Sequence, residues 1–201
     1  MALEIFQELE QGSDLWRDVR AGLLTASQFQ PLLAKSADRK GRRTLMLKKA
    51  GERITGNPSE SYSNEHMERG KEQEDTAREL YIAHTGAEVV ECGFMKDGKI
   101  GYSPDGLVGD NGLVEIKSRL AHIQADTLLS DSVPSENMAQ IQGGLWISKR
   151  EWLDYVSYTP GMPLFIKRVF PDLVYLETLV KELKAFEIEL QQVIEQIMGK
   201  F

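Results

Sequence analysis

The feature that most constrains the fold of this 201-residue chain is a change of hydrophobic period near Glu88. Before this point, apolar residues recur at helical spacing. The predicted helices cover residues 14–22, 25–33, 43–54 and 64–84. After it, short β-prone runs alternate with turns that contain glycine, as expected for hairpins. The predicted strands cover residues 89–95, 100–104, 107–108 and 113–118.

The C-terminal part alternates again between the two periods. It predicts a helix over 134–146, strands over 152–158 and 164–170, and a terminal helix over 174–198. With no internal repeat and no long linker, this order predicts a single α/β domain with a mixed central β-sheet flanked by helices. No apolar run is long enough for a membrane span or signal peptide, and the lone cysteine, Cys92, forms no internal disulfide. We therefore expect a cytoplasmic protein with no membrane partner.

The charge of the chain is unevenly distributed. The net charge is −7, yet the segment from Lys35 to Arg53 holds eight Lys and Arg against two Asp and Glu. A basic segment on an acidic body can hold phosphates, because the field that matters is the one lining the contact. The alternative is a solvated helix face.

One glutamate lies on a helical stripe that should face the sheet. Glu74 shares this stripe with Ala77 and Tyr81. An ionised carboxylate in such surroundings needs a cation, because burying it alone would cost several kcal/mol. That cation is either a metal ion or a basic side chain such as Arg78, and the sequence leaves both open.

A second acidic group lies on the predicted hairpin. Glu115 and Lys117 are two residues apart and so project from one face of their strand. A two-residue turn would turn Asp105 to the other face. The three-residue loop Asp110-Asn111-Gly112 would instead place Leu107 opposite Glu115 and Asp105 opposite Lys117, so that the three polar groups converge.

Converging carboxylates are the ligands that Mg²⁺ prefers. Metal ions held by Asp105, Glu115 and Glu74 would neutralise phosphate charge and lower the pKa of a bound water. Lys117 would position the attacking water or stabilise the charged intermediate. The pattern therefore predicts phosphodiester hydrolysis.

These residues resemble a known nuclease signature. Pro104-Asp105 followed by Glu115-Ile116-Lys117 resembles the PD-(D/E)xK motif, and residues 70–74 resemble its upstream acidic helix. Three further segments resemble the lambda exonuclease branch, also called YqaJ-type viral recombinase nucleases. They are Arg20-Ala21-Gly22-Leu23-Leu24-Thr25-Ala26-Ser27, Ser103-Pro104-Asp105-Gly106-Leu107 and Met138-Ala139-Gln140-Ile141-Gln142.

The resemblance implies a restriction-endonuclease-like fold and a set of site residues. Asp105, Glu115 and the Ile116 carbonyl would be metal ligands, and Glu74 would reach the site through water or a second ion. Lys117 would orient the nucleophile. The resemblance further implies two Mg²⁺ ions, for which Mn²⁺ can substitute. Gln140 would reach the scissile region, and Gln142 is the alternative candidate. Both glutamines could instead occupy exposed helical positions with no role in the site.

The same resemblance assigns DNA contacts to the N-terminal part. Arg20, Thr25 and Ser27 would bind a terminal 5′-phosphate, since hydroxyls and free N–H groups at a helix start bind anions. The plain alternative is a helix cap. Met67 would be an apolar wedge at the terminal base pair, or simply a core or surface methionine.

By the same resemblance, the chain is a processive 5′-to-3′ exonuclease that acts on double-stranded DNA ends and releases mononucleotides. It would form a homotrimeric ring, hand a 3′ single strand to an annealing protein, and derive from a phage or prophage in a bacterial host. Residues 1–60 would contact DNA, 64–158 would form the catalytic core and 174–199 the C-terminal helix. Two alternatives are a PD-(D/E)xK endonuclease and a non-catalytic nucleic-acid-binding module.

Overall fold

The structure is a computed structural model that describes residues 2–34, 39–59 and 65–200. Its helices are α1 (Asp14–Arg20), α2 (Arg39–Thr55), α3 (Glu65–Thr85), α4 (Ala121–Ser130), α5 (Ser135–Ser148) and α6 (Leu173–Met198), with two 3₁₀ turns, Ala26–Gln28 and Gln30–Leu33. Its strands are β1 (Glu4–Phe6), β2 (Leu24–Thr25), β3 (Val89–Val90), β4 (Phe94–Asp97), β5 (Ile100–Tyr102), β6 (Gly106–Val108), β7 (Gly112–Ser118), β8 (Trp152–Tyr158) and β9 (Phe165–Val169). The predicted α/β class is confirmed.

The larger sheet has the order β3-β6-β7-β8-β9. It is mixed, because β7 runs parallel to β8, whereas the other pairs of neighbouring strands in this sheet are antiparallel. One face packs on α3 through Ala77 and Tyr81, and α5 packs on this sheet as well. Residues 112–116 of β7 are all buried, as expected for a strand covered on both faces.

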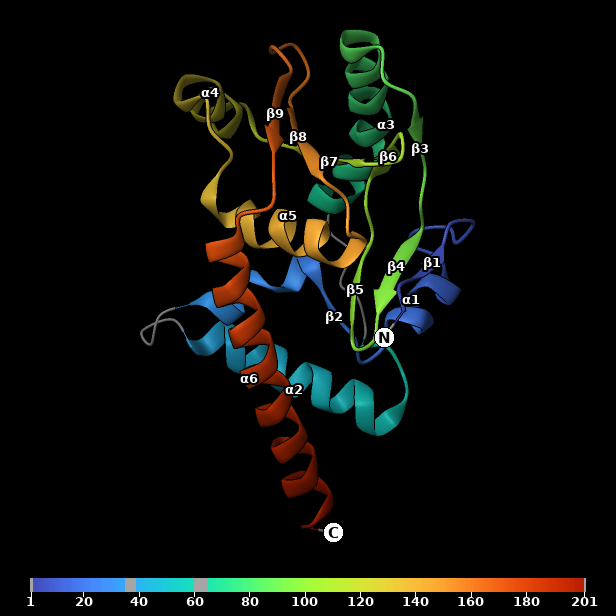
Figure 1. Cartoon of the computed structure of the whole chain (residues 1–201), viewed down its shortest axis with the longest axis vertical. Coiled ribbons are helices and arrows are strands. Elements are labelled where there is room, and N and C mark those ends of the chain that lie inside the picture. Colours follow the sequence, from blue (N-terminus) through green and yellow to red (C-terminus); the bar gives the residue numbers. More distant parts are fainter. Residues whose placement is uncertain (1, 35–38, 60–64, 201) are drawn as a thin grey trace.

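The smaller sheet has the order β1-β4-β5-β2. The predicted run of hairpins is therefore divided: the β4–β5 hairpin joins this sheet and the β6–β7 hairpin joins the larger one. Ser103-Pro104-Asp105 forms the crossing between them, and Pro104 has no N–H with which to continue a ladder. Helix α5 packs against strands of both sheets, so the crossing lies beside α5 (Figure 1).

Helix α6 is the long C-terminal helix that runs beside α2 (Figure 1). Asp172 caps its first turn by accepting from the main-chain N–H groups of Val174 and Tyr175. One stripe of the helix is buried, formed by Leu176, Leu179, Leu183, Phe186 and Leu190. Within the described ranges, the structure contains no helix long and apolar enough to cross a membrane.

The hairpin of β6 and β7 confirms the predicted loop length and corrects the pairing. Three residues, 109–111, join the strands, and Leu107 pairs with Leu113 rather than with Glu115. The loop starts one residue early because Gly109 adopts the left-handed φ of +52°, whereas Gly112 pairs in the strand against the Trp152 ring. The pairing of β6 with β7 is shifted by two residues from the predicted pairing. Because side chains alternate between faces, an even shift keeps Asp105 on the face that carries Glu115.

Candidate active site

Strand β7 presents Glu115 and Lys117 to a polar cluster at the junction of the sheets. Lys117 Nζ lies 2.6 Å from Glu115 Oε1, and Gln140 Nε2 on α5 donates to the same oxygen. The other oxygen, Oε2, accepts a 2.7 Å hydrogen bond from the Tyr102 hydroxyl on β5. Glu115 is only 1% exposed, so these donors fix the carboxylate from three elements.

Asp105 enters the cluster from the crossing that precedes β6. Its Oδ2 accepts a 2.6 Å hydrogen bond from the Ile116 main-chain N–H. This bond holds the carboxylate against β7 between Glu115 and Lys117. Because the hairpin loop has an odd number of residues, Asp105 lies on the same face of the hairpin as Glu115 and Lys117, as the functional interpretation of the sequence requires.

Of the two cations left open above, Glu74 has the basic side chain as its partner. It forms a 2.8 Å ion pair with Arg78, which also contacts Asp75 and Glu91. It also lies near enough to the cluster for the charges of Glu115 and Lys117 to act on its pKa. Glu74 is therefore next to the site with a structural partner of its own.

The carboxylates of the cluster repel one another. Burial, assisted by Glu115 and Glu74, raises the pKa of Asp105 well above its ordinary value. Burial also raises the pKa of Glu74, against the opposing effect of Arg78. Burial alone would lower the pKa of Lys117, but Glu115 and Asp105 outweigh it and raise that pKa. The lysine is therefore an ammonium ion at neutral pH.

This donor set fits a hard divalent cation. Asp105, Glu115 and the Ile116 carbonyl offer oxygen ligands, and Mg²⁺ is typically held by one or two carboxylates with several waters. A cation would relieve the repulsion that raises the Asp105 pKa. Among the described residues, no three acidic, His or Cys side chains are grouped closely enough to hold a metal as they lie, so Glu74 fits an outer role.

The segment from the last residue of α1 through the first 3₁₀ turn carries the other predicted contacts. The Arg20 guanidinium stacks on Trp16, 3.5 Å from the ring centroid. Burial lowers the Arg20 pKa to about 10, although Glu52 opposes this. In the described part of the chain, this guanidinium forms no hydrogen bond. Arg20 is half-buried, and its guanidinium can still donate to an anion that binds beside it.

Thr25 and Ser27 lie near each other, with 3.2 Å between their hydroxyl oxygens. Gln28 Oε1 accepts the Thr25 main-chain N–H at 3.2 Å, which is the capping interaction expected from the plain interpretation. The cap occupies the N–H of Thr25, and Ser27 is exposed. Capping therefore leaves the exposed Ser27 able to bind an anion, whereas Thr25 is buried in this structure.

The profile of the YqaJ-like viral recombinase domain matches residues 15–151, more than half of the chain. The chain belongs to this family. Two crystal structures of the alkaline exonuclease LHK-Exo from Laribacter hongkongensis, one in complex with dAMP, are similar along most of their length. TM-scores are 0.85 and 0.86 and identities 32% and 33%, with 94% of this chain and 97% of the other covered in each case.

More distant comparisons add the fold alone. A phage-related exonuclease from Haemophilus somnus 129PT has a TM-score of 0.62 at 14% identity, over 89% of this chain and 96% of that chain. A comparison with curated protein sequences gave no match. The matches confirm the resemblance seen in the sequence motifs.

In this YqaJ-like domain, the two candidate glutamines have different surroundings. Gln140 contacts Glu115, as described above. Gln142 is fully buried: its Nε2 donates to the Phe170 carbonyl at 2.9 Å and its Oε1 accepts the Asp172 N–H at 2.8 Å. These bonds tie α5 to the start of α6, so Gln142 lies away from the cluster. The predicted wedge, Met67, has a side chain outside the described residues.

The sequence analysis missed two members of these clusters. Tyr102 holds Glu115, and a tyrosine in a strand expected to be buried is a usable signal because its hydroxyl needs a partner. Glu52 holds the Arg20–Ser27 segment, but its position in a basic run gives no sign of burial. Gly144 on α5 packs against the Tyr102 ring.

Proposed function

We propose that this YqaJ-like domain is a Mg²⁺-dependent 5′-to-3′ exonuclease. It degrades one strand of linear double-stranded DNA processively to mononucleotides and leaves a 3′ single strand for annealing. The observation that carries the proposal is the convergence of Asp105, Glu115 and Lys117 on one face of β7, with Gln140 beside them. Family membership and the similarity to LHK-Exo along 94% of the chain support it.

In the proposed reaction, Asp105, Glu115 and the Ile116 carbonyl hold the metal, and Glu74 acts through water or a second ion. The bound metal supplies a Lewis acid and a water of lowered pKa. Lys117 is protonated and has no lone pair to accept a proton, so it acts as a donor. It orients the attacking water and stabilises negative charge on the phosphate.

We assign end recognition to Arg20, Thr25 and Ser27. The Arg20 guanidinium lacks an acceptor in the described part of the chain, and a terminal 5′-phosphate would provide one. Binding the terminal phosphate at a fixed distance from the metal site would set the 5′-to-3′ direction. Met67 remains the proposed wedge.

The basic segment contributes less free charge than its sequence implies. Arg42 pairs with Glu189, Lys49 with Glu52 and Arg53 with Glu187. Among the α2 side chains that the structure describes, the exposed cations are Lys40, Arg43 and Lys48. We propose that these line the DNA channel of a homotrimeric ring whose acidic remainder faces outward.

We extend the proposal to the organisation and setting of the protein. Residues 1–60 bind the DNA end, 64–158 carry the chemistry and 174–199 form the C-terminal helix. The product strand passes to a single-strand annealing protein in the cytosol of a bacterial host, as expected for a phage or prophage recombination system.

The test is a comparison of DNA substrates and variants. Linear duplex with a 5′-phosphate should release mononucleotides from the 5′ end in Mg²⁺, and blocking either end reveals the direction. Lys117→Ala should abolish release, whereas Lys181→Ala on the exposed face of α6 should not. Cleavage of closed circular DNA would instead support an endonuclease.

A further inference from the structure

A buried ion pair on α2 has no part in the chemistry above. Lys49 and Glu52 are 4% and 6% exposed, and Lys49 Nζ lies 2.7 Å from Glu52 Oε2. Burying two charges is costly unless hydrogen bonds satisfy the remaining polar atoms. The other bonds of this carboxylate therefore indicate what the pair does.

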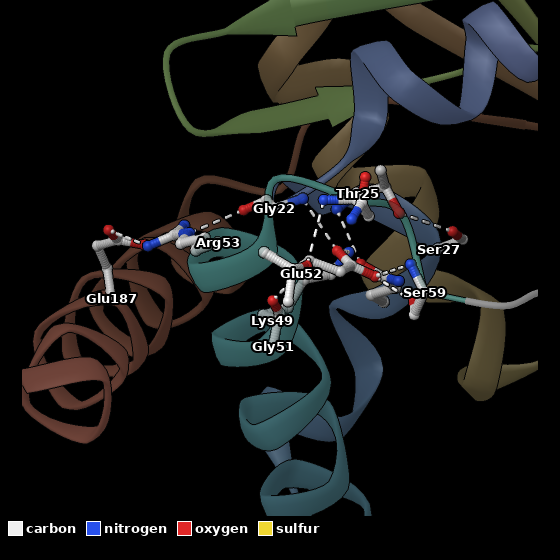
Figure 2. Close-up of polar contacts among 12 residues, drawn as sticks. Gly22, Thr25, Ser27, Lys49, Gly51, Glu52, Arg53, Ser59 and Glu187 are labelled. Carbon is white, nitrogen blue, oxygen red and sulfur yellow. Dashed lines mark hydrogen bonds and ion pairs between the residues drawn. The ribbon is translucent and has the colours of Figure 1, made fainter. Parts of the chain in front are cut away.

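Glu52 holds the main chain of Gly22. Its Oε2 accepts the Gly22 N–H at 2.9 Å, and the next residue, Arg53, donates from Nε to the Gly22 carbonyl at 2.9 Å (Figure 2). Arg53 is itself fixed by Glu187, with bonds of 2.7 and 2.8 Å. Gly22 has a φ of +72°, and a Cβ there would lie 2.9 Å from Arg53 Cγ.

The position of Gly22 makes this clamp relevant to the DNA end. Gly22 lies two residues after Arg20 and three before Thr25, within the segment assigned to the terminal phosphate. Helix α2 thus fixes both the main-chain N–H and the main-chain carbonyl of Gly22, near the middle of that segment. Figure 2 shows Thr25 and Ser27 beside the Glu52 cluster.

Glu52 also reaches a third segment. The hydroxyl of Ser59 donates to Glu52, and the Ser59 N–H lies 3.4 Å from Oε1. Ser59 precedes α3, the helix that carries Glu74 beside the cluster of Asp105 and Glu115. One carboxylate is therefore bonded to the phosphate segment and to the chain that leads to the catalytic helix.

We propose that Glu52 is a positioning residue that sets specificity for 5′-phosphorylated DNA ends. Through Gly22 it fixes where Arg20 and Thr25 present their donors, and Lys49 holds the carboxylate in place. The inference rests on the proposed role of Arg20, Thr25 and Ser27 as a site for a 5′-phosphomonoester. Loss of the Glu52 carboxylate should weaken recognition of the phosphate and leave the metal site intact.

The variants Glu52→Ala and Glu52→Gln test the proposed positioning role. Glu177→Ala, on the exposed face of α6, is the matched control. Binding of duplexes with 5′-phosphate and 5′-hydroxyl ends is measured by fluorescence anisotropy in a Lys117→Ala background, so that no hydrolysis occurs. Glu52→Ala should reduce the phosphate preference roughly tenfold, the scale of a lost hydrogen bond to a charged group. Glu52→Gln keeps an acceptor for Gly22 and should reduce it by about threefold.

In the protein that retains Lys117, both Glu52 variants should lower the rate on 5′-phosphate ends more than the rate on 5′-hydroxyl ends, and Glu177→Ala should change neither rate. A purely structural role would instead lower the Tm and weaken both duplexes equally, and an unchanged ratio would overturn the proposal. So would a parent protein with no phosphate preference, even if it degrades DNA. If Glu52→Ala does not fold, the Glu52→Gln ratio decides. Failure of the parent to release nucleotides would refute the exonuclease, which is a separate readout.

Discussion

Substitution of Gly144 by alanine tests whether Tyr102 positions the catalytic carboxylate. Gly144 lies on α5 against the Tyr102 ring, and a Cβ added there would be 2.7 Å from Tyr102 Cζ. The ring would have to move by at least about 0.7 Å to reach an ordinary contact of 3.4 Å. Tyr102 is 1% exposed, so it has no solvent to move into.

The displacement should affect both stability and activity. Overpacking of a buried site costs about 1–3 kcal/mol, which lowers the Tm of a domain of this size by about 3–9 °C. The Tyr102 hydroxyl holds Glu115 Oε2 at 2.7 Å, so movement of the ring displaces a proposed metal ligand. A misplacement near 1 Å can cost about 100-fold in rate. We expect a loss of about 10- to 100-fold, measured as release of labelled nucleotide from linear duplex at saturating Mg²⁺.

Gly51→Ala is the matched control. Gly51 lies in α2, and a Cβ there would meet nothing within 4 Å. The same substitution should therefore raise stability by about 0.5–1 kcal/mol through helix propensity. Tyr102→Phe separates the two effects, since it removes the hydroxyl without adding volume. Gly144→Ala with the Tm and rate of the parent protein would show that Tyr102 does not transmit the contact to Glu115.

Three further predictions concern the same cluster. Gln140→Leu should reduce nucleotide release with little change in Tm, whereas Gln142→Leu should lower the free energy of unfolding by about 1–3 kcal/mol and preserve the rate per folded molecule; the reverse pattern would exchange their roles. Because the pKa of Asp105 is raised in the metal-free folded chain, the folded chain binds a proton at Asp105 more tightly than the unfolded chain does. The contribution of Asp105 to stability therefore falls as the pH rises from about 4, its unfolded pKa, through its folded pKa. Asp105→Asn should therefore raise the Tm in EDTA at pH 8 and flatten its fall with pH, and a lower Tm across that range would contradict the repulsion. Mg²⁺ at 100 times its Kd should stabilise the parent protein by about 2.7 kcal/mol in thermal unfolding, and an equal gain in Asp105→Asn would place the ion elsewhere.

Elements with strong local signals were predictable from the sequence. Ser13 caps α1 by accepting the Trp16 N–H at 3.2 Å, and β8 has the predicted bounds, Trp152–Tyr158. In contrast, no element was assigned to residues 4–6, because β1 depends on pairing with the distant strand β4. Short strands of this kind have no period of their own.

Helix α4 was missed for a different reason. Its buried residues include the polar pair Gln124 and Thr127, so it lacks an apolar stripe. Gln124 is fixed by the carbonyls of Ser157 and Pro163, at 3.1 and 2.8 Å. A helix whose contacts with the fold include such hydrogen bonds from buried polar side chains cannot be recognised from hydrophobic period alone.

In the candidate site, too, features set by local strand and loop geometry were predictable, whereas features set by contacts between distant elements were not. The shared face of Glu115 and Lys117 follows from strand geometry, and Asp105 joins them through the parity of a three-residue loop. Gln140 was preferred to Gln142 and does contact Glu115, but strand and helix periods alone could not decide between them, because the contact depends on where α5 crosses the two sheets. The roles of Tyr102 and Glu52 likewise depend on contacts between elements distant in the chain.

A buried carboxylate elsewhere on the larger sheet shows why the cluster is better explained by a cation than by structure alone. Asp154 on β8 is 2% exposed and is fully paired: Arg168 donates to both oxygens at 2.8 and 2.9 Å, and the Tyr81 hydroxyl donates at 2.7 Å. The fold can therefore neutralise a buried acid when only stability is required. At Asp105 and Glu115 the positive charge in the described chain is the single ammonium of Lys117, and the Asp105 pKa rises because the carboxylate is buried and because one positive charge does not offset the carboxylates around it. The proposed divalent cation would supply the missing charge.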